Sequence, residues 1–172
     1  LYDVVSQRMG EEWATFIVLY RQNGPAAANQ GARTSPLSNA QLDFNKQGSR
    51  KFNQVLELIG ARVQVTQQGS ATPVLFASPI TEDIPSMAAG LPIMMDNLCA
   101  SDSPYIPGRI NINQAPKLVL QGVPGMTEDI LTELLSRRRA EPDENQPNRQ
   151  FETWLVAEGI CTLAEMKILE PF

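Results

Sequence analysis

Histidine is absent from this chain of 172 residues. Because histidine is the usual general base, the usual partner of a nucleophilic serine and the commonest transition-metal ligand, its absence disfavours most hydrolase and zinc chemistries. No serine lies in a GxSxG sequence, and none has the SxxK spacing of lysine-assisted nucleophiles. The sequence therefore predicts a protein that is not an enzyme and has no small-molecule substrate.

Cysteine and long apolar runs are also scarce. Cys99 and Cys161 lie far apart and form no CxxC pair, so they are compatible with one long-range disulfide or with two buried thiols, which we favour. No apolar run approaches the roughly 18 to 20 residues that span a bilayer, and the first residues do not resemble a signal peptide. Since Leu1 opens directly into a helical pattern, we expect a fragment whose targeting or membrane segment lies upstream.

Basic residues are outnumbered by acidic ones, 14 against 19, which gives a net charge of -5 and a pI near 4.8. This balance disfavours a general polyanion-binding surface, so nucleic acid is an unlikely partner. The 42% hydrophobic content suffices for an ordinary core in one domain or two small ones.

Periodic apolar residues predict two helices in the first third of the chain. The first covers Glu11 to Arg21 and stops at Gly24-Pro25. Residues 26–39 have no periodicity and are predicted to form a long loop. The second helix is predicted from Ser49 to Ile59, with Gly60 at its C-terminal cap.

A β-hairpin is the clearest strand signal. Ala61 to Thr66 alternates with period two, Gln68 to Ser70 can turn the chain, and Val74 to Ala77 returns. A further helix is predicted from Ile84 to Leu98. We therefore expect an α+β fold, mainly helical, with a small antiparallel β element.

Arg109 to Arg139 has the pattern of a helix-hairpin-helix unit. Asn113 is the predicted N-cap of its first helix, and Thr127 is the predicted start of its second. Between them, glycine and proline favour a tight turn. The candidate interaction residues of this unit are Asn111, Asn113, Ala115, Pro116, Gly122, Pro124, Gly125, Met126 and Thr127.

The unit resembles the helix-hairpin-helix (SAM-like) motif of DNA-repair and DNA-uptake proteins, whose hairpin glycines offer backbone N–H groups to a phosphate. Here Thr127 replaces the second glycine, and Glu128 and Asp129 would face the phosphate. Arg137 to Arg139 suits dipole compensation at a helix end. We therefore favour packing or protein contact, and keep a nucleic-acid (DNA) binding module as the alternative.

The strings GRININQAP and VLQGVPGMTEDIL resemble the signature of type II secretion system protein K, also called general secretion pathway protein K, a family of minor pseudopilins. The resemblance implies the periplasmic portion of a bacterial inner-membrane protein anchored by an upstream helix. It also implies other minor pseudopilins as partners, and a role in pseudopilus tip assembly and protein secretion.

The resemblance also implies a division into three segments. Residues 1–25 would be the second half of a first helix-hairpin-helix-like module, because residues 9–21 echo residues 126–138. Residues 26–100 would be an α/β segment with a flexible loop and the β-hairpin. Residues 101–172 would hold the helix-hairpin-helix module and a closing helical pair.

A calcium site is implied by the resemblance alone, since some family members bind this ion. Asp143, Glu144 and Asn145 offer oxygen ligands, but no EF-hand spacing surrounds them, and a solvated acidic loop is the favoured interpretation. We assign no metal ligand and expect no cofactor.

Overall fold

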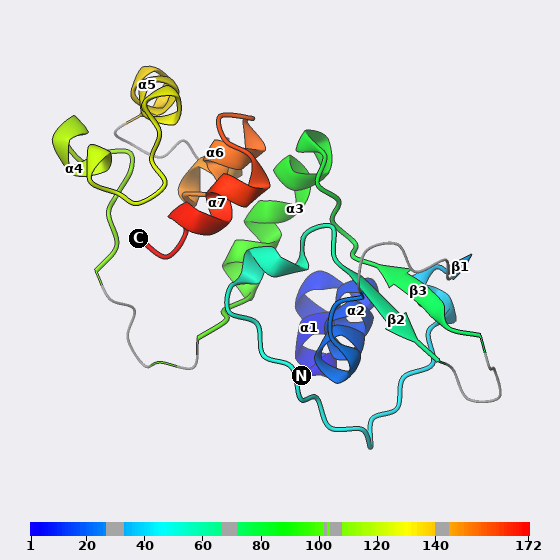
Figure 1. Ribbon diagram of the computed structural model, residues 1–172. Coiled ribbons are helices and arrows are strands. Elements are labelled where there is room, and N and C mark those ends of the chain that lie inside the picture. Colours follow the sequence, from blue (N-terminus) through cyan, green and yellow to red (C-terminus); the bar gives the residue numbers. More distant parts are fainter. Residues whose placement is uncertain (27–32, 67–71, 102, 104–107, 140–144) are drawn as a thin grey trace. The chain divides into compact units, whose positions relative to one another are not determined.

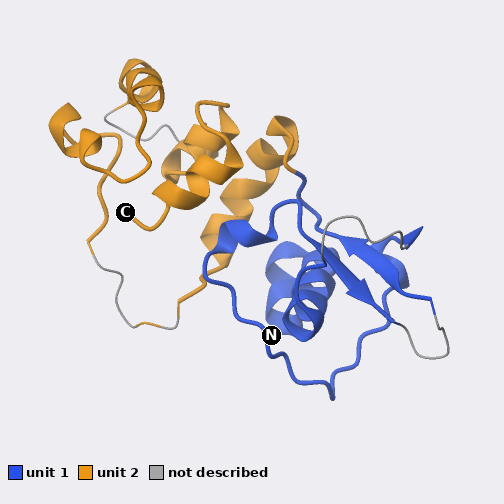
Figure 2. Ribbon diagram, in the orientation of Figure 1, with its two compact units in different colours: residues 1–81 blue, residues 82–172 orange. Residues whose placement is uncertain are grey.

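The computed structural model describes residues 1–26, 33–66, 72–101, 103, 108–139 and 145–172. They belong to two compact units, residues 1–81 (unit 1) and residues 82–172 (unit 2), shown in Figures 1 and 2. The described residues form seven α-helices and one three-stranded sheet, so the predicted α+β, mainly helical fold is confirmed. None of these helices is long and apolar enough to cross a membrane.

Unit 1 begins with helices α1 (Tyr2–Met9) and α2 (Glu11–Asn23), which pack on one another on either side of Gly10. The predicted α2 is confirmed, and Gly24 ends it with φ +77°. Its residues from Ala14 to Tyr20 are all buried, so α2 is the centre of the unit 1 core.

The sheet of unit 1 has the order β1-β3-β2. The predicted hairpin is confirmed by antiparallel β2 (Arg62–Val65) and β3 (Val74–Ala77), in which the fully buried Val63 and Phe76 are partners. Strand β1 (Arg33–Thr34) pairs parallel with β3 and lies inside the predicted loop 26–39. Strand β1 has only two residues and both are exposed, so it shows no alternation of apolar and polar residues, and the sequence did not indicate it.

The predicted helix over residues 49–59 is wrong. This stretch contains only the 3₁₀ turn η2 (Val55–Leu58), and another, η1 (Leu37–Asn39), precedes it in the chain. The amides of Ser49 and Arg50 both donate to the carbonyl of Arg21, at 2.9 and 3.0 Å. This backbone therefore satisfies the open C-terminal end of α2 instead of bonding to itself.

Unit 2 begins with α3 (Ile84–Asn97), which confirms the helix predicted there. Helices α4 (Lys117–Gln121) and α5 (Glu128–Arg137) follow, then the 3₁₀ turn η3 (Pro147–Gln150) and the pair α6 (Trp154–Ala157) and α7 (Leu163–Leu169). Helix α6 packs against α3, η3 and α7 and is buried along its whole length. It is the centre of the unit 2 core.

Both cysteines are free thiols, but only one is buried as predicted. Cys161 lies in the core of unit 2, whereas Cys99 follows the end of α3 and is exposed. The prediction that both are buried is wrong for Cys99, because the helix ends before it and leaves it with a contact to the carbonyl of Ser101.

Candidate interaction site

The helix-hairpin-helix unit begins with a polar turn rather than with a helix. The Asn111 side chain accepts from the amide of Asn113 at 3.0 Å, and the Asn111 carbonyl accepts from the amides of Gln114 and Ala115. Helix α4 begins only at Lys117, with Pro116 at its N-cap position. The prediction that Asn113 caps this helix is therefore wrong, since Asn111 closes a turn of its own before the helix.

The hairpin between α4 and α5 packs its backbone against α7. Gly125 has φ +84°, and a Cβ atom on it would lie 2.7 Å from Cγ2 of Ile168. Thr127 accepts the amide of Ile130 on its side-chain oxygen at 3.2 Å, which confirms the predicted start of α5. Residue 125 is therefore best served by glycine for two reasons: its φ is positive, and its backbone lies too close to Ile168 for an added Cβ atom.

The basic side chains around the hairpin are engaged within unit 2. Lys117 pairs with Glu128 at 3.2 Å, and Arg137 pairs with Glu133 at 2.8 Å. Arg138 donates to the carbonyl of Ala115 at 2.6 Å. The Lys117 and Arg138 contacts tie the two sides of the hairpin together, and the Arg137 pair lies within α5. All three support the structural interpretation of the basic run.

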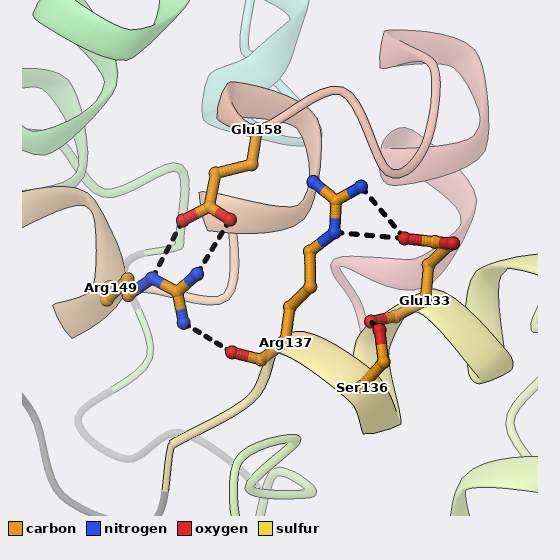
Figure 3. A network of polar contacts seen from close by, with 5 residues as sticks. All are labelled: Glu133, Ser136, Arg137, Arg149 and Glu158. Carbon is orange, nitrogen blue, oxygen red and sulfur yellow. Dashed lines mark hydrogen bonds and ion pairs between the residues drawn. The ribbon is translucent and has the colours of Figure 1, made fainter.

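Arg149 contacts both Glu158 and Arg137 (Figure 3). Its Nε and Nη2 atoms each donate to a carboxylate oxygen of Glu158 at 2.7 Å, and Nη1 donates to the carbonyl of Arg137 at 2.7 Å. The guanidinium also lies 4.6 Å from the ring centre of Trp154. Arg149 therefore fixes the end of α5 to α6, a role that no sequence signal indicated.

A small pocket of about 80 Å³ lies beside the hairpin. Its walls come from the segment before α4, the hairpin turn, α6 with the residues before it, and α7 with the residues after it. Most of its lining side chains are apolar, among them Ile110, Val123, Met126, Leu155, Met166 and Leu169. Of the hairpin residues predicted to make contacts, Met126 contributes to the wall of this pocket.

Three charged side chains also line the pocket. Arg109 contacts Glu152 through Nη1 at 3.1 Å and Glu170 through Nη2 at 3.5 Å. Burial raises the pKa of Glu170, Arg109 opposes the rise, and the nearby Glu152 adds to it. Two carboxylates therefore share one guanidinium, and the edge carries a net charge of -1 when both are ionised.

The predicted interaction residues divide into three groups. Met126 lines the pocket, and Gly125 lies against α7. Thr127 caps α5, while the exposed Gly122 and Pro124 complete the turn. The remaining four residues form the turn before α4 and its N-cap; they are Asn111, Asn113, Ala115 and Pro116.

Sequence reasoning missed the charged edge of the pocket. Arg109 lies in the GRININQAP string, but its two acidic partners are 43 and 61 residues away in the chain. Asp143 and Glu144 of the calcium hypothesis lie outside the described residues. Across the described ranges, no three histidine, cysteine or acidic residues are grouped as a metal site would require.

Comparisons with known proteins add no relative to this description. No protein-family model matches the chain, and neither does any curated protein or any solved structure.

Proposed function

We propose that this chain is a non-enzymatic assembly module, a protein K-like minor pseudopilin of a type II (general) secretion system. In this role it binds other minor pseudopilins in the periplasm and takes part in pseudopilus tip assembly and protein secretion. The proposal includes an inner-membrane anchor upstream of this chain. The proposed role requires no cofactor.

The observation that carries a protein-binding role is the exposed apolar face of α4. Leu118, which lies between the two signature strings, has 80% of its surface exposed, and Val119, which opens the second string, has 45%. Exposed apolar residues that lie together are typical of protein contacts. The signature strings around them support the pseudopilin assignment.

The surroundings of the hairpin disfavour the alternative of DNA binding. Glu128 and Asp129 occupy the first turn of α5, where a phosphate would have to approach. Lys117, Arg137 and Arg138 are engaged with groups of unit 2. A duplex would have to displace these contacts and meet a chain of net charge -5.

The test is a pull-down of the chain against the minor pseudopilins of its source organism, with a short DNA duplex as a parallel bait. Leu118→Ser should lower pseudopilin capture by roughly 5- to 30-fold, the usual effect of removing an interface anchor. Val4→Ser, at a residue 61% exposed in unit 1, is the matched control and should leave capture unchanged. Capture of DNA without any pseudopilin would overturn the proposal in favour of the alternative.

A further inference from the structure

The pocket beside the hairpin communicates with solvent. Arg109 has 42% of its side chain exposed, and Phe172, which also lines the pocket, is 44% exposed. The opposite walls, made by Leu155 and Met166, are buried in the core of unit 2. An apolar space with an exposed edge and a buried floor can admit a group from outside.

The size of the pocket selects what can enter it. Its volume of about 80 Å³ is far below the roughly 300 to 1,000 Å³ of sites for free small molecules, so it fits a single side chain. It is also about half of the roughly 150 Å³ that accommodates a benzene ring. An aliphatic side chain is therefore expected as the occupant in preference to an aromatic one.

The charges at the edge select what lies beside that side chain. The contacts with Arg109 use the Oε1 atoms of Glu152 and Glu170. The Glu152 side chain is 27% exposed and the Glu170 side chain 12%, so a cation that approaches this edge meets chiefly the Glu152 carboxylate. Unit 2 adds a longer-range attraction, because residues 82–172 contain 14 acidic and 7 basic residues, a net charge of -7. The preferred neighbour is a lysine or arginine.

We propose that this pocket binds one aliphatic side chain of a partner polypeptide in which lysine or arginine residues flank that side chain. This proposal rests on the proposed function in one respect, namely that the occupant is a segment of a partner protein. The GRININQAP string and the hairpin would then act together, since Arg109 and Ile110 from the string and Val123 and Met126 from the hairpin make adjoining parts of the site.

The probe is the capped peptide Gly-Lys-Leu-Lys-Gly, titrated against the whole chain carrying ¹³C-methyl methionine. Of the six methionines, Met126 and Met166 line the pocket and the others are internal references. Saturable shifts are expected at these two methyl groups. Replacing the leucine of the peptide by serine should weaken binding about 10- to 100-fold, and replacing it by tryptophan should also weaken it.

The charge selection is tested separately. Replacing both lysines of the peptide by glutamate should weaken binding several-fold, and 1 M salt should reduce this difference because it screens partly exposed charges. Glu152→Gln should weaken binding of the lysine peptide, while Asp96→Asn, which removes the same charge from the exposed side of α3, should not. Both substitutions are nearly isosteric, so folding is retained.

Four results would overturn the proposal: no saturable shift at Met126 and Met166, equal affinity for lysine and glutamate peptides, preference for tryptophan, or shifts that depend on chain concentration without peptide. The last would make a second copy of the chain the occupant. Peptide binding without pseudopilin capture would remove the proposed function and leave this site in place. Pseudopilin capture without peptide binding would remove this site and leave the proposed function in place.

Discussion

Replacing Gly125 with alanine is expected to destabilise unit 2 by about 2 to 4 kcal/mol. The left-handed conformation at φ +84° costs a residue with a Cβ atom about 1 to 2 kcal/mol. The new Cβ atom would also lie 2.7 Å from Cγ2 of Ile168, and overpacking of this kind costs about 1 to 3 kcal/mol. Ile168 is half-exposed, so its side chain can move and lower the steric part of this cost.

The same hairpin provides a matched control at Gly122. Its φ of -80° is available to any residue, and the nearest atom to an added Cβ is the Val119 carbonyl oxygen at an ordinary 3.4 Å. Gly122→Ala should therefore be neutral or stabilise the chain by up to about 1 kcal/mol, because alanine restricts the unfolded chain. The two substitutions are chemically identical, so their difference isolates conformation and contact.

The assay is urea unfolding followed by tryptophan fluorescence. The chain has two tryptophans, Trp13 in unit 1 and Trp154 in unit 2, so a Trp13→Phe background reports on unit 2 alone. Adding Ile168→Ala should recover the steric part of the loss at Gly125 and leave the conformational part. The reasoning is refuted if Gly125→Ala costs no more than Gly122→Ala.

Three further predictions concern the polar groups of unit 2. Arg149→Ala should cost about 2 to 4 kcal/mol in urea unfolding, because it leaves Glu158 without its bidentate partner, and Arg149→Lys should restore less than half. Thr162→Ala should cost about 1 kcal/mol by removing the hydroxyl bonds of the α7 capping box. The backbone N–H of Thr162 and, to a lesser extent, its hydroxyl hold the pKa of Glu165 below 4.5, so this stability is present above pH 4.5 and lost as pH falls through the lowered pKa. Alanine keeps the backbone N–H, so the substitution should lessen this acid sensitivity only in part. Glu170 has a raised pKa, so folding favours its protonated form. Its contribution to the free energy of unfolding therefore falls as pH rises from 4.5 through the raised pKa. Glu170→Gln should flatten that fall in unfolding midpoints measured between about pH 4 and 7.

The features that the sequence predicted correctly are those set by neighbouring residues. Thr127 caps α5 with an amide three residues away, and Gly125 adopts the positive φ that its turn requires. The alternation of residues 61–66 and the apolar run at residues 74–77 were sufficient to predict the β2–β3 hairpin. These signals act within a few residues, so no knowledge of the tertiary structure was needed to interpret them.

The features that the sequence did not predict depend on distant parts of the chain. Residues 49–50 are not helical because the end of α2 offers their amides the carbonyl of Arg21, and β1 is a strand only because β3 lies beside it. The pocket brings Arg109 to carboxylates 43 and 61 residues further along. Hydrogen bonds and ion pairs of this range carry no periodic pattern, so only the tertiary structure determines them.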